Sequence, residues 1–208
     1  MAPIENALER VRGFFARRGP VADIGDLEDF IDQHAAFGVQ KCIVEYCRAR
    51  AGIQWSKLFK EKDFLAALNE ARWRAYPVGV GNIAEMLDAA LRPAAGERGD
   101  VLIAALTRCA RHVLQRHPVP DGAEEDFWTR EIAILDERMG KVSMRPPKPV
   151  KDIPIPTAKR IFDLLPIHAE LRGHDYELIK NNLRINLCRS SEIFSERARR
   201  GELIEDLL

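Results

Sequence analysis

The chain has 208 residues, 46% of them hydrophobic and 31% charged, and its 32 basic residues balance its 32 acidic residues. This balance provides no overall positive field to gather phosphates, and the longest apolar runs fall short of the about 20 residues that a membrane-spanning helix needs. The first residues carry Glu5 rather than a basic region followed by an apolar segment, so we expect no secretory signal. Arginine outnumbers lysine, as is typical of GC-rich bacterial genomes, and we predict a cytoplasmic bacterial protein.

Apolar residues recur at three- and four-residue spacing along nearly the whole chain, which predicts an all-α protein. We expect a first helix over residues 4–15, ended by Gly19 and Pro20, and a longer second helix that Asp26 opens. The apolar face of this second helix rotates after Gly38. That rotation predicts a kink or a break at the glycine.

A third helix is expected over residues 61–76, because the residue before Pro77 disfavours the helical conformation. Residues 77–81 then form a predicted turn, and Asn82 caps a helix that ends near Pro93, with Glu85 completing a capping box. A helix that begins there has free backbone N–H groups, which makes its start a candidate anion site. The residues of this candidate site are Gly79, Gly81 and Asn82. Further helices are expected over residues 99–116 and 123–139.

Residues 141–156 contain five of the twelve prolines and predict an extended basic connector. Beyond it we expect a short helix over residues 157–165 and a long one over residues 174–200. The predicted architecture is a multi-helix bundle in two parts: an N-terminal bundle (1–140), the connector (141–156), and a C-terminal helical segment (157–208) that packs on the bundle. The connector can bind an acidic partner or strap the two parts together, and the alternation of Ile153 and Ile155 with prolines favours the strap.

Polar residues lie in the middle of the apolar face of the long C-terminal helix. Leu178 and Ile185 mark one flank of this face, and Leu183 lies on the other. Between them runs a mixed polar ridge: Asp175, Ile179, Asn182, Asn186, Arg189 and Ile193. A buried polar group without a partner costs about 1–3 kcal/mol, so these groups must bond to the protein, to water or to a ligand. A structural network and the floor of a ligand pocket both fit this pattern, and His168 and His174 lie close enough in sequence to join such a pocket.

The histidines and cysteines form no metal-binding spacing, so we expect no metal and no cofactor. His34 lies alone on an apolar helix face and is predicted to be a core histidine. Cys109 is predicted to be buried, and His117 to lie at a helix C-terminus, where the helix dipole favours it. None of the four cysteines lies in a CxxC pair, so we expect free thiols.

No serine lies in a nucleophile motif, and we assign no catalytic residue. The segments RWRAYP at residues 72–77, IAEM at 83–86, PVKDI at 149–153 and LPIH at 165–168 resemble a poorly characterised family of all-helical alphaproteobacterial proteins, some of which are labelled esterases. The resemblance covers most of the chain. It implies a helical fold and ester hydrolysis as an alternative activity, and it brings no catalytic residue with it.

The pattern as a whole predicts a non-enzymatic helical binding or adaptor protein that acts on an unknown protein or a small polar ligand. An esterase-like hydrolase is the first alternative. Association with nucleic acid through the basic connector is the second and the weaker one. The sequence leaves the oligomeric state open, a homo-oligomer included.

Overall fold

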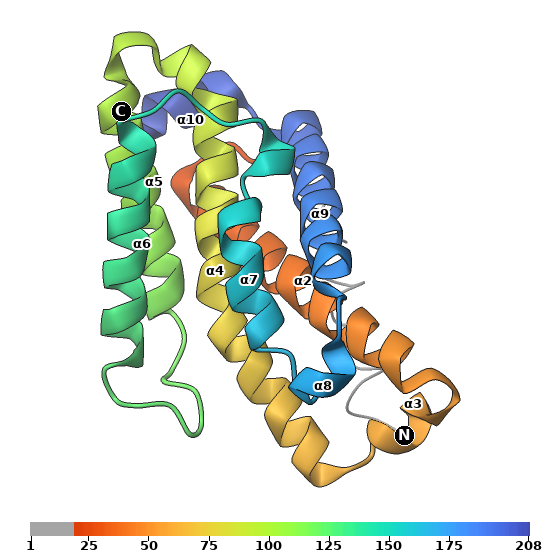
Figure 1. Cartoon of the computed structure of the whole chain (residues 1–208). Coiled ribbons are helices and arrows are strands. Elements are labelled where there is room, and N and C mark those ends of the chain that lie inside the picture. Colours follow the sequence, from red (N-terminus) through yellow and green to blue (C-terminus); the bar gives the residue numbers. More distant parts are fainter. Residues whose placement is uncertain (1–18) are drawn as a thin grey trace.

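A computed structural model describes residues 19–208, in which every regular element is a helix, as predicted (Figure 1). The predicted helix over residues 4–15 lies outside the described residues. The α-helices are α2 (Ile24–Ala51), α3 (Trp55–Leu58), α4 (Lys62–Ala95), α5 (Gly99–Gln115), α6 (Phe127–Ser143), α7 (Ile155–Asp163), α8 (Ala169–Arg172), α9 (Tyr176–Arg197) and α10 (Arg200–Leu207). Short 3₁₀ turns precede α3, α5 and α7. None of the described helices is both long and apolar enough to span a bilayer.

The α2 helix begins at Ile24, two residues before the predicted opening residue Asp26, and then runs without a break. The side chain of Asp23 accepts a hydrogen bond from the Asp26 backbone N–H at 2.7 Å. The helix continues through Gly38, so the predicted break is wrong. The rotation of the apolar face has another cause: Phe30 and Ile31 pack in one core cluster, whereas Val39 and later residues pack in a second.

The α4 helix also continues where the sequence predicts a turn. It passes through Pro77 and Gly79 to Ala95, so the helix end before Pro77 and the turn at 77–81 are wrong. Gly79 allows α2 to pack closely against α4, because a Cβ atom at this position would lie 2.8 Å from the carbonyl oxygen of Ala35. The close approach of α2 buries Val80 and its neighbours, and this packing outweighs the helix-breaking tendency of proline.

Helices from both predicted parts share the two cores. In Figure 1, α5 and α6 lie along one side of α4, and α7 and α9 lie along the other. Leu187, Phe194 and Leu203 from the C-terminal segment belong to the first core cluster, while Ile161 and Leu183 belong to the second. The C-terminal helices therefore share both cores with the helices that precede the connector.

The connector is shorter and less extended than predicted. The α6 helix reaches Ser143, a 3₁₀ turn spans Val150–Asp152, and α7 begins at Ile155. Between α6 and this turn, residues 144–149 cross from one side of α4 toward the other (Figure 1). Ile153 is fully buried against the first core, which agrees with the strap interpretation, but Ile155 remains partly exposed.

Candidate functional site

The polar ridge of α9 is largely satisfied by the protein itself. The Asn186 amide donates a hydrogen bond to the Asn182 side-chain oxygen at 2.6 Å, and the Tyr46 hydroxyl donates to Asp175 at 3.0 Å. Arg189 is exposed. These contacts match the structural network rather than the floor of a pocket, because the ridge is split between separate partners.

The exposure of one flank of α9 and of the nearby histidines also argues against the pocket hypothesis. Leu178 and Ile185 were expected to be covered, but they are 62% and 66% exposed. His168 and His174 are exposed, and His168 lies 4.0 Å from the Glu170 carboxylate. The prediction that both flanks of this helix face are covered is wrong, because α9 packs on its neighbours through a narrower stripe than its apolar residues suggest. Within residues 19–208 no group of three or more side chains could hold a metal ion.

The three residues of the predicted anion site lie in the middle of α4, so no free helix N-terminus exists there. Gly79 instead admits α2. Gly81 admits α6, because a Cβ atom at this position would lie 2.8 Å from Nη1 of Arg138. The Asn82 side-chain oxygen accepts hydrogen bonds from Arg138 at 2.9 Å and from the Thr157 hydroxyl at 3.2 Å. Gly81 and Asn82 thus contact Arg138, which lines a different site.

That site is a cleft of about 280 Å³ between α4, α6 and the connector, which we call the connector cleft. Glu85 lies at its floor with only 4% of its side chain exposed. Arg138 donates from Nε and Nη2 to one oxygen of this carboxylate, at 3.1 and 2.7 Å. Lys148 of the connector donates to the other oxygen at 2.7 Å. A single buried carboxylate therefore holds one cation from α6 and one from the connector.

A second buried carboxylate fixes the end of α6. Asp88 has almost no exposed surface, and burial raises the pKa of its carboxyl group, although the bonds from Arg92 act in the opposite direction. Arg92 donates from Nε to Asp88 at 2.9 Å and also to the backbone carbonyl oxygens of Val142 and Arg145. This arginine ties the start of the connector to α4 and so sets the width of the cleft.

Apolar side chains form most of the remaining walls of the connector cleft. The apolar lining residues are Ile134, Val142, Pro146, Pro147, Ile153 and Pro156. Two more cations, Lys141 and Arg145, lie along the lining. Lys141 pairs with Glu137 at 2.6 Å, whereas the guanidinium of Arg145 has no partner among the described residues. The cleft thus combines apolar walls with several charged groups.

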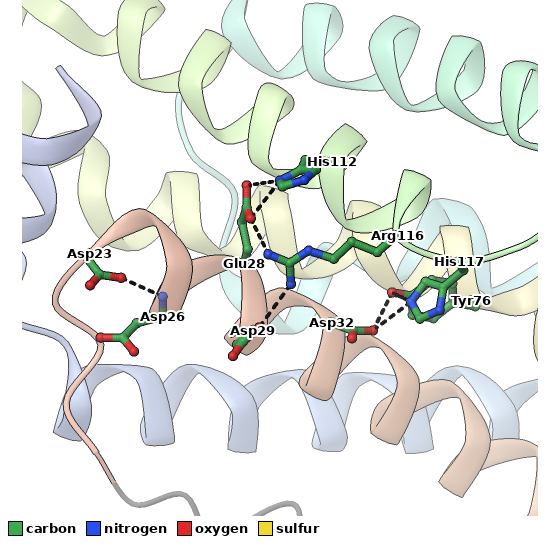
Figure 2. A network of polar contacts seen from close by, with 9 residues as sticks. All are labelled: Asp23, Asp26, Glu28, Asp29, Asp32, Tyr76, His112, Arg116 and His117. Carbon is green, nitrogen blue, oxygen red and sulfur yellow. Dashed lines mark hydrogen bonds and ion pairs between the residues drawn. The ribbon is translucent and has the colours of Figure 1, made fainter.

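A second polar cluster, the α2–α5 seam, joins two helices (Figure 2). Glu28 of α2 is buried and is bound by His112 at 2.8 Å and by Arg116, both from the end of α5. Arg116 also reaches Asp29 at 3.0 Å. Because the buried carboxylate is paired on both sides, the seam fastens α5 to α2.

The seam continues at the C-terminal end of α5. Asp32 accepts a hydrogen bond from the Tyr76 hydroxyl at 2.6 Å and lies 3.3 Å from Nε2 of His117 (Figure 2). Burial raises the pKa of Asp32, but the bonds from His117 and Tyr76 outweigh it and the net shift is downward. Trp73 and Trp128 pack around the His117 ring, with centroids 5.4 and 6.5 Å away. His117 thus lies just beyond the C-terminal end of α5 and makes a specific contact with Asp32 of α2.

Ser190 and His34 form a hydrogen-bonded pair that the sequence does not reveal. The Ser190 hydroxyl oxygen lies 2.8 Å from Nδ1 of His34, and both residues are nearly inaccessible, at 3% and 2% exposure. His34 is a core histidine, as predicted, and Cys109 is buried, as predicted. Burial lowers the pKa of His34 to about 3, with a smaller contribution from the charge of Arg197.

Sequence reasoning missed Glu85 and Arg138 as partners across the cleft. The available signal was weak: Gly81 and Glu85 lie four residues apart on one face of an otherwise apolar helix, which is typical of a close contact with a charged side chain. The chemistry of the cleft must be inferred from these residues themselves. No protein-family model, no curated protein and no solved structure gives a significant match to the chain.

Proposed function

We propose that this chain is a non-enzymatic helical binding protein of the bacterial cytoplasm, which takes a small ligand into the connector cleft. The observation that carries the proposal is the combination of apolar walls with a buried, charged floor built on Glu85. Pockets of small-molecule sites have this character, with a few converging polar groups in a mostly apolar cavity.

The charged floor is costly to build, which supports a binding role over a purely structural one. An ion pair buried in a protein gains less from attraction than it loses in hydration unless its geometry is good, and apolar residues of similar size often stabilise a fold at least as well. Arg138 and Lys148 nevertheless meet at one carboxylate beside an open space. Contact with a ligand would account for the placement of these buried charges.

The proposal is tested by mapping where small molecules bind. We would screen a fragment set of mixed charge by ¹⁵N chemical-shift changes, and we expect hits to perturb residues of the connector cleft. Ile134→Trp places a large ring on the cleft wall and should remove these perturbations, because Ile134 is half exposed there. Val101→Trp, at a similarly exposed position on α5 outside the cleft lining, is the control. Hits that bind elsewhere, or that survive Ile134→Trp, would refute the proposal.

Ester hydrolysis is a second candidate, because a serine hydroxyl within hydrogen-bond distance of a histidine is the arrangement that nucleophilic catalysis needs. Two observations rank it lower. Both side chains are buried, and a histidine whose pKa is about 3 is a weak base at neutral pH. An ester panel decides the question: hydrolysis that is lost in Ser190→Ala supports the hydrolase, and absent or unchanged hydrolysis excludes this pair as its centre.

Binding of nucleic acid through the connector finds less support. Lys148 pairs with Glu85, Lys159 with Asp163, and Arg160 with Glu131, so much of the positive charge in this region is already neutralised within the protein. Residual affinity for nucleic acid should fall steeply with salt if phosphate contacts carry it.

A further inference from the structure

We infer that the ligand of the connector cleft is a small organic monoanion, a carboxylate attached to an apolar group; the inference rests on the proposed binding function. Its first support is the charge of the lining. The buried carboxylate of Glu85 is shared by two cations, Arg138 and Lys148. The guanidinium of Arg145 also lines the cleft and has no partner among the described residues, and the lining as a whole carries four cations against three carboxylates.

The hydrogen-bond inventory points the same way. Both oxygens of Glu85 and the side-chain oxygen of Asn82 already accept hydrogen bonds. Donors remain, because Nη1 of Arg138 has no hydrogen-bond partner among residues 19–208, and the Lys148 ammonium carries three hydrogens of which Glu85 takes one. A ligand that fits this cleft must therefore bring acceptors, and a carboxylate brings two oxygens in the geometry that guanidinium groups bind.

The same lining disfavours a doubly charged ligand. Glu85, Asp88 and Glu137 also line the cleft, and each of them repels a phosphate dianion more strongly than a monoanion. The lining carries only one more cation than carboxylates, so one negative charge matches it better than two. A free carboxylate, rather than a phosphate ester, is the group that this charge balance selects.

Size and walls define the rest of the ligand. The volume of about 280 Å³ lies at the lower limit of cavities that hold drug-sized molecules, so the ligand is small. Ile134, Val142 and Ile153 contribute aliphatic surface, and Pro146 and Pro147 add flat apolar faces from the connector. An aliphatic or aromatic ring next to the carboxylate would cover this surface, while a sugar or an amino acid would leave its polar groups unpaired against it.

The experiment compares probes of one shape and different charge on the full chain. Benzoate, benzamide and phenyl phosphate are titrated at millimolar concentration, and binding is followed by chemical-shift changes of the residues lining the connector cleft. We expect benzoate to bind at least about tenfold more tightly than benzamide, because charge-assisted hydrogen bonds replace neutral ones. Phenyl phosphate should bind no better than benzoate.

Variants test which cation is responsible. Arg145→Gln removes the unpaired guanidinium, which lies on the surface and supports no described contact through its side chain, so the fold should be unchanged. It should weaken benzoate several-fold and leave benzamide unaffected. Arg130→Gln, which breaks an exposed pair with Asp126 outside the cleft lining, is the control and should change neither.

Each result separates the two proposals. If benzamide binds in the cleft as tightly as benzoate, the binding function stands and the anion inference is overturned. Tighter binding of phenyl phosphate overturns the monoanion in favour of a phosphate. If none of the three probes perturbs the cleft while the mixed fragment set does, the ligand class is wrong, and if neither does, the proposed function is wrong as well.

Discussion

Acidification should destabilise this protein through His34, whose ring is buried in the first core and stacks on Phe30 with a centroid distance of 4.0 Å. Burial lowers the pKa of His34 from 6.5 to about 3. The folded protein therefore keeps this histidine neutral at a pH where the unfolded chain protonates it. A group with a lowered pKa stabilises the fold above its unfolded pKa, and the contribution is lost as the pH falls toward the folded value.

The size of the effect follows from the shift. One pKa unit corresponds to about 1.4 kcal/mol, so the contribution of His34 declines by about that amount for each pH unit between about 6.5 and 3. At pH 5 the loss is about 2 kcal/mol. Since single domains are stable by about 5–15 kcal/mol, this loss is a large fraction of the total.

The assay is urea unfolding at several pH values between 7.5 and 5. His34→Gln retains a side chain that can bond to Ser190 but does not titrate, so its free energy of unfolding should fall by about 2 kcal/mol less than that of the wild type over this range. His168→Gln, which replaces an exposed histidine, is the control and should follow the wild type. Parallel pH profiles for wild type and His34→Gln would refute the reasoning, whatever the stability of the variant at pH 7.5.

Three further predictions concern packing and the polar seam. Gly79→Ala should destabilise the fold strongly, because its Cβ atom would meet the backbone of Ala35. Gly140→Ala meets nothing within 4 Å and should stabilise the fold by up to about 1 kcal/mol. Thermal unfolding compares the two variants, and equal shifts in Tm would contradict the close contact at Gly79. Tyr76→Phe should cost about 1–3 kcal/mol in denaturant unfolding because it removes a donor to Asp32, and an unchanged midpoint would show that the contact is not stabilising. Ile153→Ala should cost about 2–5 kcal/mol if the connector is a strap, and a loss below about 1 kcal/mol would count against that role.

The sequence predicts several helix ends to within about two residues, although α6 begins and ends four residues later than expected and α9 ends at Arg197. The start of α2 near Asp26, the end of α4 near Pro93 and the span of α5 all agree with expectation. The predictions fail at Pro77 and Gly38, where local breaking signals compete with tertiary packing. At Pro77 the burial of α4 against α2 prevails, and such burial depends on a partner helix that no local pattern shows.

The candidate site could not be predicted for a related reason. Asn82 and Glu85 have the spacing of a capping box, and a local interpretation uses them for each other. In the structure both turn outward from α4 to partners far along the chain, Arg138 on α6 and Lys148 on the connector. The spacing of these residues thus fits a local capping pattern, but their contacts in the structure are tertiary and depend on the position of α6.

The connector links the stability of the fold to the chemistry of the cleft. Ile153 anchors it in the core, Arg92 holds its start through backbone carbonyl oxygens, and Lys148 reaches the buried Glu85. A ligand carboxylate would share Lys148 with Glu85, so it would act on the segment that forms the cleft wall as well as on the cation itself. Because a ligand that binds only the folded state stabilises it, occupancy of the cleft should hold the connector more firmly against α4. We therefore propose that the Pro-rich segment acts both as a strap and as a wall of the cleft, and that the contact between Lys148 and Glu85 contributes to both roles.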